Sequence, residues 1–124
     1  MNNIELIINV YKCFFDGDLE GWAKFHTDDF ELKQSGDFPH SGTFIGPIVA
    51  IEESFSKIPL TLPNLSIEPI SFFESGNVVL VHALMTAENF RAETMHMFTI
   101  NDGLVSKFQS FDDTAAIAQS VKTR

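Results

Sequence analysis

Two of the four histidines, His82 and His96, lie in neighbouring stretches in which inward and outward positions alternate. The alternation predicts two strands, and it places His96 on the same face as Thr94 and Phe98. An imidazole among apolar side chains is neutral near pH 7, where it can act as a general base or as a hydrogen-bond donor. His96 is therefore the first candidate for proton-transfer chemistry. The structural alternative is a hydrogen-bonded histidine that only lines a core.

The turn between these two strands decides whether His82 faces the same side as His96. A three-residue turn at Glu88-Asn89-Phe90 places the two imidazoles opposite each other on one face. A two-residue turn at Glu88-Asn89 places them on opposite faces. Facing histidines can bind a metal when carboxylates join them. The sequence supplies no evident third ligand, so neither a metal nor a cofactor is expected.

Three helices are predicted ahead of the main run of strands. The first runs from about Asn3 to Phe15, and Gly17 ends it because glycine tolerates positive φ. Asp18 then caps a second helix that runs to about His26, and His26 is expected to cap this helix or to face water. The third begins at Pro47, since proline suits the first helical position; its buried stripe is predicted to be Ile48, Ile51, Phe55 and Ile58. Aromatic residues of the helices that suit a cavity wall as well as a plain core are Tyr11, Phe14, Trp22 and Phe55.

A short strand is predicted at Phe30–Gln34, and four longer strands follow the third helix. These four cover about Leu65–Phe73, Val78–Ala87, Arg91–Ile100 and Leu104–Phe111. Residues 35–46, between the short strand and the third helix, are rich in turn formers, so a loop is predicted there. His40 in this loop is expected either to lie at the mouth of a pocket or to stand in a solvated turn. Asp112 or Asp113 is expected to cap a final helix. This order of elements predicts a single α+β domain over residues 1–124.

Both faces of the strand at 78–87 are largely apolar, although the helices can cover only one face of a sheet. We expect the outer face to carry Val79, Val81, Ala83, Met85 and Ala87, with Met95 and Met97 of the next strand. An exposed apolar patch of this size favours a partner, so a homodimer through the outer sheet face is predicted. The alternative is that the C-terminal helix covers this face.

The composition excludes several classes of function. A net charge of -9 disfavours nucleic acids and anionic membrane surfaces, both of which attract cationic proteins. The single cysteine, Cys13, rules out an internal disulfide. Thirteen phenylalanines against one tyrosine and one tryptophan suit a dry core or a dry pocket. The N-terminal residues do not resemble a secretory leader and no segment is long enough to span a membrane, so a cytoplasmic protein is expected.

Four stretches carry a resemblance to a known family. They are DGDLEG at 16–21, FHTDDF at 25–30, PHSGTFIG at 39–46 and HMFTINDGLV at 96–105. With these stretches the chain resembles the SnoaL-like, ketosteroid-isomerase-like branch of the nuclear transport factor 2 (NTF2-like) superfamily. The resemblance implies a cone, or cystatin-like fold, in which a strongly curved, mostly antiparallel sheet wraps around three helices. It also implies an apolar pocket inside the cone, with His96 pointing into it.

The resemblance also bears on the chemistry. Ketosteroid isomerase uses an aspartate base opposite a tyrosine and a protonated aspartate. Here the resemblance places Gln34 at the position of the base and His96 at that of the second aspartate. Tyr11 corresponds to the tyrosine, but its spacing to Gly17 differs by one residue, which can turn its hydroxyl out of the pocket. Steroid isomerisation by that mechanism is not expected. His96 and Asp112 instead look similar to the histidine and late acid of the polyketide-cyclase branch.

The sequence thus predicts a protein that binds a small apolar molecule and transfers a proton through His96, with help from Gln34, Tyr11 or Asp112. An enolisable substrate and isomerase-like or cyclase-like chemistry fit this set. The residues predicted to contact the ligand are Phe14, Trp22, Phe55, His82, Phe98 and His40. A histidine used in binding is expected to make ligand-induced stabilisation change near pH 6 to 7. The alternative is a dimeric ligand-binding or scaffold protein without catalysis.

Overall fold

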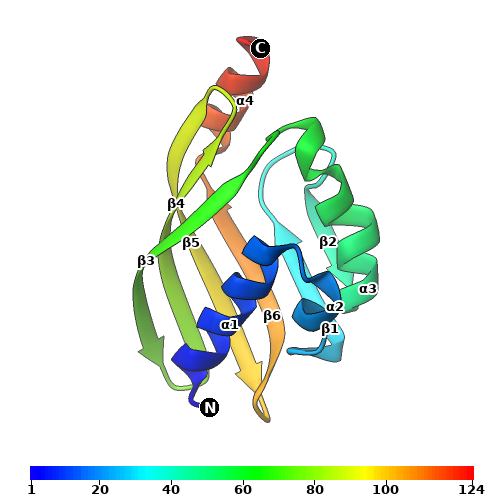
Figure 1. Cartoon of the computed structure of the whole chain (residues 1–124), viewed down its shortest axis with the longest axis vertical. Coiled ribbons are helices and arrows are strands. Elements are labelled where there is room, and N and C mark those ends of the chain that lie inside the picture. Colours follow the sequence, from blue (N-terminus) through cyan, green and yellow to red (C-terminus); the bar gives the residue numbers. More distant parts are fainter.

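Six strands form one curved sheet in the computed structural model, which describes residues 1–124 (Figure 1). Their order across the sheet is β2-β1-β6-β5-β4-β3. In chain order they are β1 (His26–Gln34), β2 (Gly42–Ile45), β3 (Ser66–Ser75), β4 (Val78–Ala87), β5 (Phe90–Asn101) and β6 (Leu104–Asp112). Strands β1 and β6 run parallel, and every other neighbouring pair is antiparallel. The predicted α+β class with a mostly antiparallel sheet is confirmed.

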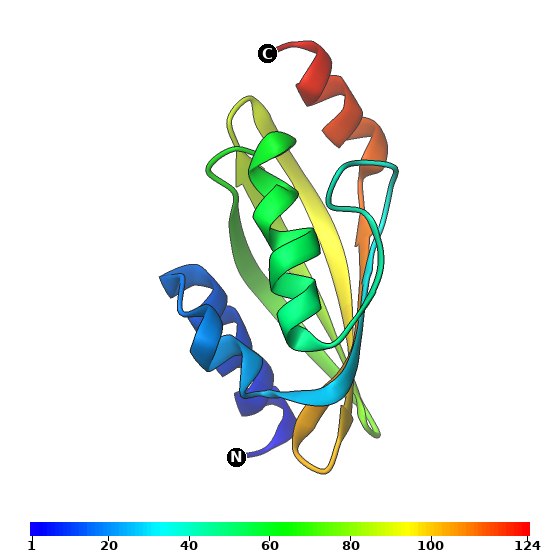
Figure 2. The ribbon, with the colours of Figure 1, turned by 90° about the vertical axis from the view of Figure 1, so that its right-hand side faces the viewer.

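Helices cover the inner face of the sheet and one of its ends (Figures 1 and 2). They are α1 (Asn3–Asp16), α2 (Leu19–Ala23), a continuous segment made of α3 (Pro47–Val49), η1 (Ala50–Ser54) and η2 (Phe55–Leu60), and α4 (Thr114–Lys122). Helix α1 lies against β3 and β4, and the N- and C-terminal ends of the chain lie at opposite ends of the long axis. None of the helices combines the length and apolar character that crossing a bilayer requires.

Local capping sets the break between α1 and α2 as predicted. Gly17 ends α1 with a φ of 71°, in the left-handed region that glycine enters without a steric penalty. The Asp18 side chain then accepts a hydrogen bond from the Gly21 amide at 2.9 Å and caps α2. However, α2 ends at Ala23 rather than near His26, because the chain there already turns into β1.

The third helical segment begins at Pro47 as predicted, but its buried face differs from the prediction. Ile48 is 56% exposed, whereas Ala50 and Ser54 are fully buried. Ile58 is buried as predicted, so the difference lies in Ala50 and Ser54, which a stripe drawn through large apolar residues omits because one is small and the other polar. A π-helical turn links the α-helical start of this segment to its 3₁₀-helical end.

Strand β2 was not predicted, since residues 35–46 read as a loop. It is a four-residue edge strand that pairs with β1, with Gln34 opposite Gly42. Three of its four residues are exposed, so it lacks the inward-outward alternation by which a strand is detected in a sequence. Strand β1 also begins earlier than predicted, at His26 instead of Phe30.

The β4–β5 hairpin settles the open question about the two histidines. Ala87 pairs with Phe90, so the turn has two residues, and Asn89 adopts a left-handed φ of 57° there. His82 therefore faces away from His96, and the arrangement with facing imidazoles is wrong.

The same register corrects the expected outer face of β4. The inward residues are Val79, Val81, Ala83 and Met85, all of which are buried. The outward residues are Val78, Leu80, His82 and Leu84, which are partly exposed. A shift of one residue in pairing moves every side chain to the other face, which is why the predicted outer patch of Val79, Val81 and Met85 is wrong. Met95 and Met97 of β5 do lie on the outer side, where Met97 pairs with Leu80.

Helix α4 closes one end of the fold and leaves the outer face of the sheet open. Asp113, and not Asp112, caps α4 by accepting a hydrogen bond from the Ala116 amide at 3.0 Å. Ile117 of this helix is buried against Met85 and Phe90, which belong to the inner side.

Candidate functional site

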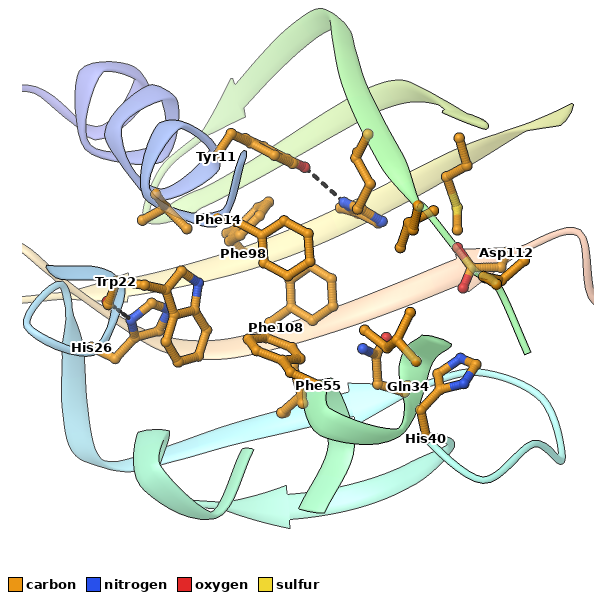
Figure 3. Close-up of a pocket in the computed structure, with 18 of the residues that line it drawn as sticks. Tyr11, Phe14, Trp22, His26, Gln34, His40, Phe55, Phe98, Phe108 and Asp112 are labelled. Atoms are coloured by element: carbon orange, nitrogen blue, oxygen red, sulfur yellow. Dashed lines mark hydrogen bonds between the residues drawn. The ribbon is translucent and has the colours of Figure 1, made fainter. Parts of the chain in front are cut away.

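A cavity lies between the helices and the concave face of the sheet (Figure 3). It contains about 650 Å³ of atom-free space including its mouth, and 14 of its 19 lining residues are hydrophobic. The predicted site residues that line it are Tyr11, Phe14, Trp22, Gln34, His40, Phe55, His96, Phe98 and Asp112. Since these residues come from seven separate parts of the chain, only the tertiary fold brings them together.

The central polar contact of the cavity joins Tyr11 of α1 to His96 of β5. The Tyr11 hydroxyl lies 2.7 Å from His96 Nδ1, and the two rings are stacked (Figure 3). Either the phenol donates to Nδ1 and leaves a proton on Nε2, or Nδ1–H donates to the phenol oxygen and leaves Nε2 as an acceptor. The spacing from Tyr11 to Gly17 thus does not turn the hydroxyl out of the cavity.

Burial controls the charge of this pair. His96 is 4% exposed, and loss of hydration lowers its pKa to about 4 although the carboxylate of Asp112 acts in the opposite direction. Burial likewise raises the pKa of Tyr11 above its ordinary value, and Asp112 adds to this shift. At neutral pH the pair is therefore a neutral imidazole bonded to a neutral phenol, an arrangement that can accept one proton and donate another.

A second polar group lies at one end of the cavity, where β1 and β6 finish. Asp112 accepts a hydrogen bond from the Thr94 hydroxyl, and its own amide donates to Ser35 Oγ at 3.2 Å. Gln34 precedes Ser35 and also lines the cavity, so its amide group belongs to the same end (Figure 3). Because Asp113 takes the capping role, the carboxylate of Asp112 remains available to the cavity.

His40 belongs to this polar end as well, although a solvated turn was an equally open expectation. The residue is 3% exposed and lines the cavity near Asp112 (Figure 3). Burial lowers the pKa of His40, opposed by the carboxylate of Asp112, so its ring is neutral at pH 7.

His26 was expected to cap a helix or to face water; it caps the C-terminal end of α2 through the Trp22 carbonyl, and the water-facing alternative is wrong. It is 6% exposed, and its ring centroid lies 3.9 Å from that of Trp22 and 4.4 Å from that of Phe30. Its Nδ1 donates to the Trp22 carbonyl at 2.7 Å, which leaves Nε2 of the neutral ring as an acceptor. Burial lowers the pKa of His26 to about 4. Extending the inward alternation of Phe30 and Leu32 back along β1 would have reached this residue.

His82 lies outside the cavity, so its predicted ligand contact is wrong. It projects from the outer face of the sheet, where Nε2 lies 2.6 Å from a carboxylate oxygen of Glu93. No group of three His, Cys, Asp or Glu side chains is arranged to hold a metal ion.

The fold is similar to that of solved NTF2-like and cystatin-like structures. TerC, crystallised with polyporic acid, is 26% identical, with a TM-score of 0.86 over 97% of this chain and 98% of that one. An NTF2-like protein of unknown function from Burkholderia pseudomallei is 22% identical, with a TM-score of 0.86 over 98% of both chains. IdmH from Streptomyces antibioticus, proposed as a polyketide cyclase, is 15% identical, with a TM-score of 0.81 over 98% and 99% of the two chains.

The family follows from the sequence match. Residues 7–108 match the SnoaL-like domain, and the protein belongs to this family of the NTF2-like superfamily. No curated protein matches the chain.

Proposed function

We propose that the protein binds a small, largely apolar molecule with an enolisable or enolic oxygen, and that His96 transfers a proton to or from it. The hydrogen bond between Tyr11 and His96, at 2.7 Å inside a mainly apolar cavity, is the observation that carries this proposal. An imidazole must be unprotonated to accept a proton, and the lowered pKa of His96 keeps it so at pH 7.

The neighbouring groups supply the rest of the chemistry. Tyr11 is held as a neutral phenol and can donate a hydrogen bond to a developing enolate oxygen once a substrate displaces its contact with His96. Asp112 stabilises the imidazolium that forms when His96 takes a proton, since its charge already acts on that ring. Gln34 has an amide that cannot accept a proton at neutral pH, so it orients a substrate by hydrogen bonding.

The similarity to TerC supports the class of ligand. TerC was crystallised with polyporic acid, an aromatic hydroxyquinone, and its chain is similar to this one over nearly the whole length of both. A flat aromatic molecule suits the phenylalanine-rich wall that surrounds Tyr11 and His96 here. Isomerase-like or cyclase-like reactions both begin with removal of a proton beside a carbonyl, which is the step assigned to His96.

Two measurements test binding and catalysis separately. Polyporic acid should quench the fluorescence of Trp22, which is the single tryptophan and lines the cavity. β-Tetralone, an enolisable aromatic ketone, should exchange its acidic protons for deuterium in D₂O faster with the protein than in buffer, as followed by NMR. His96→Gln should lose at least about tenfold of this acceleration, whereas His82→Gln on the outer face should keep it.

The outcomes separate the two functional classes. If neither compound binds, the proposed cavity function is wrong. If both bind but exchange is no faster than in buffer, the protein is a non-catalytic binder, the alternative that the amide at Gln34 favours. If His96→Gln exchanges as fast as wild type, another residue is the base.

We also propose that the protein forms a homodimer through the outer face of the sheet. Partly exposed apolar residues gather there on neighbouring strands, namely Val78, Leu80, Leu84, Met95 and Met97. Neither α4 nor any other helix of the chain packs on this side. An uncovered apolar sheet face is typical of a surface that meets a partner.

A further inference from the structure

One buried polar atom of the cavity wall has no partner. His40 is almost completely buried, and its Nδ1 makes no hydrogen bond. Native structures rarely leave such an atom unpaired, because its lost hydration is not replaced. Thr27 Oγ1 is the only other side-chain atom of this kind, and Thr27 does not line the cavity. Since the His40 ring also lines the cavity and no side-chain hydrogen bond engages it, the residue brings unused hydrogen-bonding capacity to the cavity wall.

The fold holds His40 in place independently of any ligand. Its carbonyl accepts a hydrogen bond at 2.7 Å from Oγ of Ser54, which is fully buried. Its ring stacks on Phe38 with an interplanar angle of 10°. The loop is tied further by Ser41, whose hydroxyl donates to the Ser35 carbonyl at 2.8 Å. A side chain fixed in this way is preorganised, so it loses little freedom when it forms a contact.

The position of His40 in the cavity defines what it can contact. His40, Gln34 and Asp112 lie at one end, and Trp22 lies at the other, with phenylalanine rings between them (Figure 3). The cavity thus has one polar end and one aromatic end. Since the His40 ring is neutral and carries one donor and one acceptor, it suits a hydroxyl, which can act in either role.

We propose that His40 is a specificity-determining residue, which hydrogen-bonds a hydroxyl group of an aromatic ligand whose ring lies toward Trp22. This inference rests on the proposed binding function and names its ligand class, a fused or linked aromatic with a hydroxyl at one end. His96 acts on the middle of such a molecule, and His40 selects which end enters the polar region.

A matched pair of probes tests the contact. β-Naphthol and naphthalene differ by one hydroxyl, so the ratio of their dissociation constants isolates the contribution of that group. Wild type should bind β-naphthol about tenfold more tightly, as expected for one buried hydrogen bond. His40→Leu should reduce this preference to about twofold or less while leaving the affinity for naphthalene nearly unchanged. His40→Asn places a polar atom close to the position of Nδ1 and should keep most of the preference. His82→Leu, on the outer face, is the matched control and should behave as wild type.

A measurement on the wild-type protein keeps the inference testable if the leucine variant does not fold. The imidazole nitrogen resonances of His40 should shift when β-naphthol binds and stay in place when naphthalene binds. If neither probe binds, the proposed cavity function fails and this inference fails with it. If both bind but the preference is absent in wild type or survives in His40→Leu, the inference alone is overturned. Unshifted His40 resonances with bound β-naphthol overturn it as well.

Discussion

Acidification should destabilise the protein through His26, and the size of the effect follows from its surroundings. The ring lies between Trp22 and Phe30, and burial lowers its pKa from 6.5 to about 4. An unfolded chain binds a proton at His26 once the pH falls below about 6.5, whereas the folded chain resists until about pH 4. The stability that a neutral His26 provides is therefore complete above pH 6.5 and is lost as the pH falls toward 4.

The magnitude comes from the difference between the two pKa values. One pH unit of difference corresponds to about 1.4 kcal/mol, so His26 alone should lower the free energy of unfolding by about 2 kcal/mol between about pH 7 and pH 4.5. This is a large part of the stability of a domain of this size, which is about 5–15 kcal/mol.

His26→Asn tests this effect directly. Asparagine keeps a donor near the Trp22 carbonyl, as Nδ1 of His26 does now, but it does not titrate. The variant should be less stable at pH 7, because the packing of the ring is lost. Its loss of stability from about pH 7 to pH 4.5 should nevertheless be about 2 kcal/mol smaller than that of wild type. Urea unfolding followed by far-ultraviolet circular dichroism measures both quantities without relying on Trp22.

The test of the role of His26 is how the free energy of unfolding changes with pH, and not its value at one pH. His82→Asn removes a histidine from the outer face and is the control for losing a histidine outside the cavity. If the curves for His26→Asn and wild type run parallel from pH 7 to 4.5, His26 is not the buried, uncharged ring described above.

Two further predictions concern the cavity and the outer face. Because burial lowers the pKa of His96 to about 4, the protein-catalysed rate of β-tetralone exchange should stay level from about pH 7 to pH 5 and fall as His96 becomes protonated near pH 4. This prediction replaces the change near pH 6 to 7 that was expected from the sequence. An inflection of the rate near pH 6 to 7 would contradict the buried state of His96. For the dimer, light scattering should give twice the chain mass for wild type. The double variant Leu80→Lys with Met97→Lys places two like charges opposite each other on the outer face. It should be a monomer with an unchanged circular dichroism spectrum. A wild-type monomer at all concentrations would refute the proposed interface.

The elements that depend on local chemistry could be predicted from the sequence. Gly17 and Asp18 mark the break between α1 and α2, and Pro47 marks the start of α3, because each acts on backbone groups within a few residues. The strands β3 to β6 were also predicted within a few residues, since turn formers separate them. The fold class followed from the order of these elements, and the family from the resemblance carried by four stretches of the sequence.

The boundaries that were missed have causes beyond local preference. Strand β2 is short, mostly exposed and paired with a single neighbouring strand, β1, so it leaves no alternating pattern. The buried face of the third helical segment includes Ala50 and Ser54, a small and a polar residue that the apolar pattern does not mark although tertiary packing buries both. The register of the β4–β5 hairpin depends on one residue in the turn, which reverses every face along β4.

The sequence by itself determined which side chains are available for chemistry, and it singled out His96, Asp112 and Tyr11. Only the tertiary structure decided what these side chains can do. Tyr11 and His96 are 85 residues apart in the chain yet form one hydrogen bond. The burial of His26 and His40, which keeps both rings neutral, comes from the closing of helices and loops over the sheet. Burial and pairing are properties of the packed chain, because both depend on neighbours that no local pattern specifies.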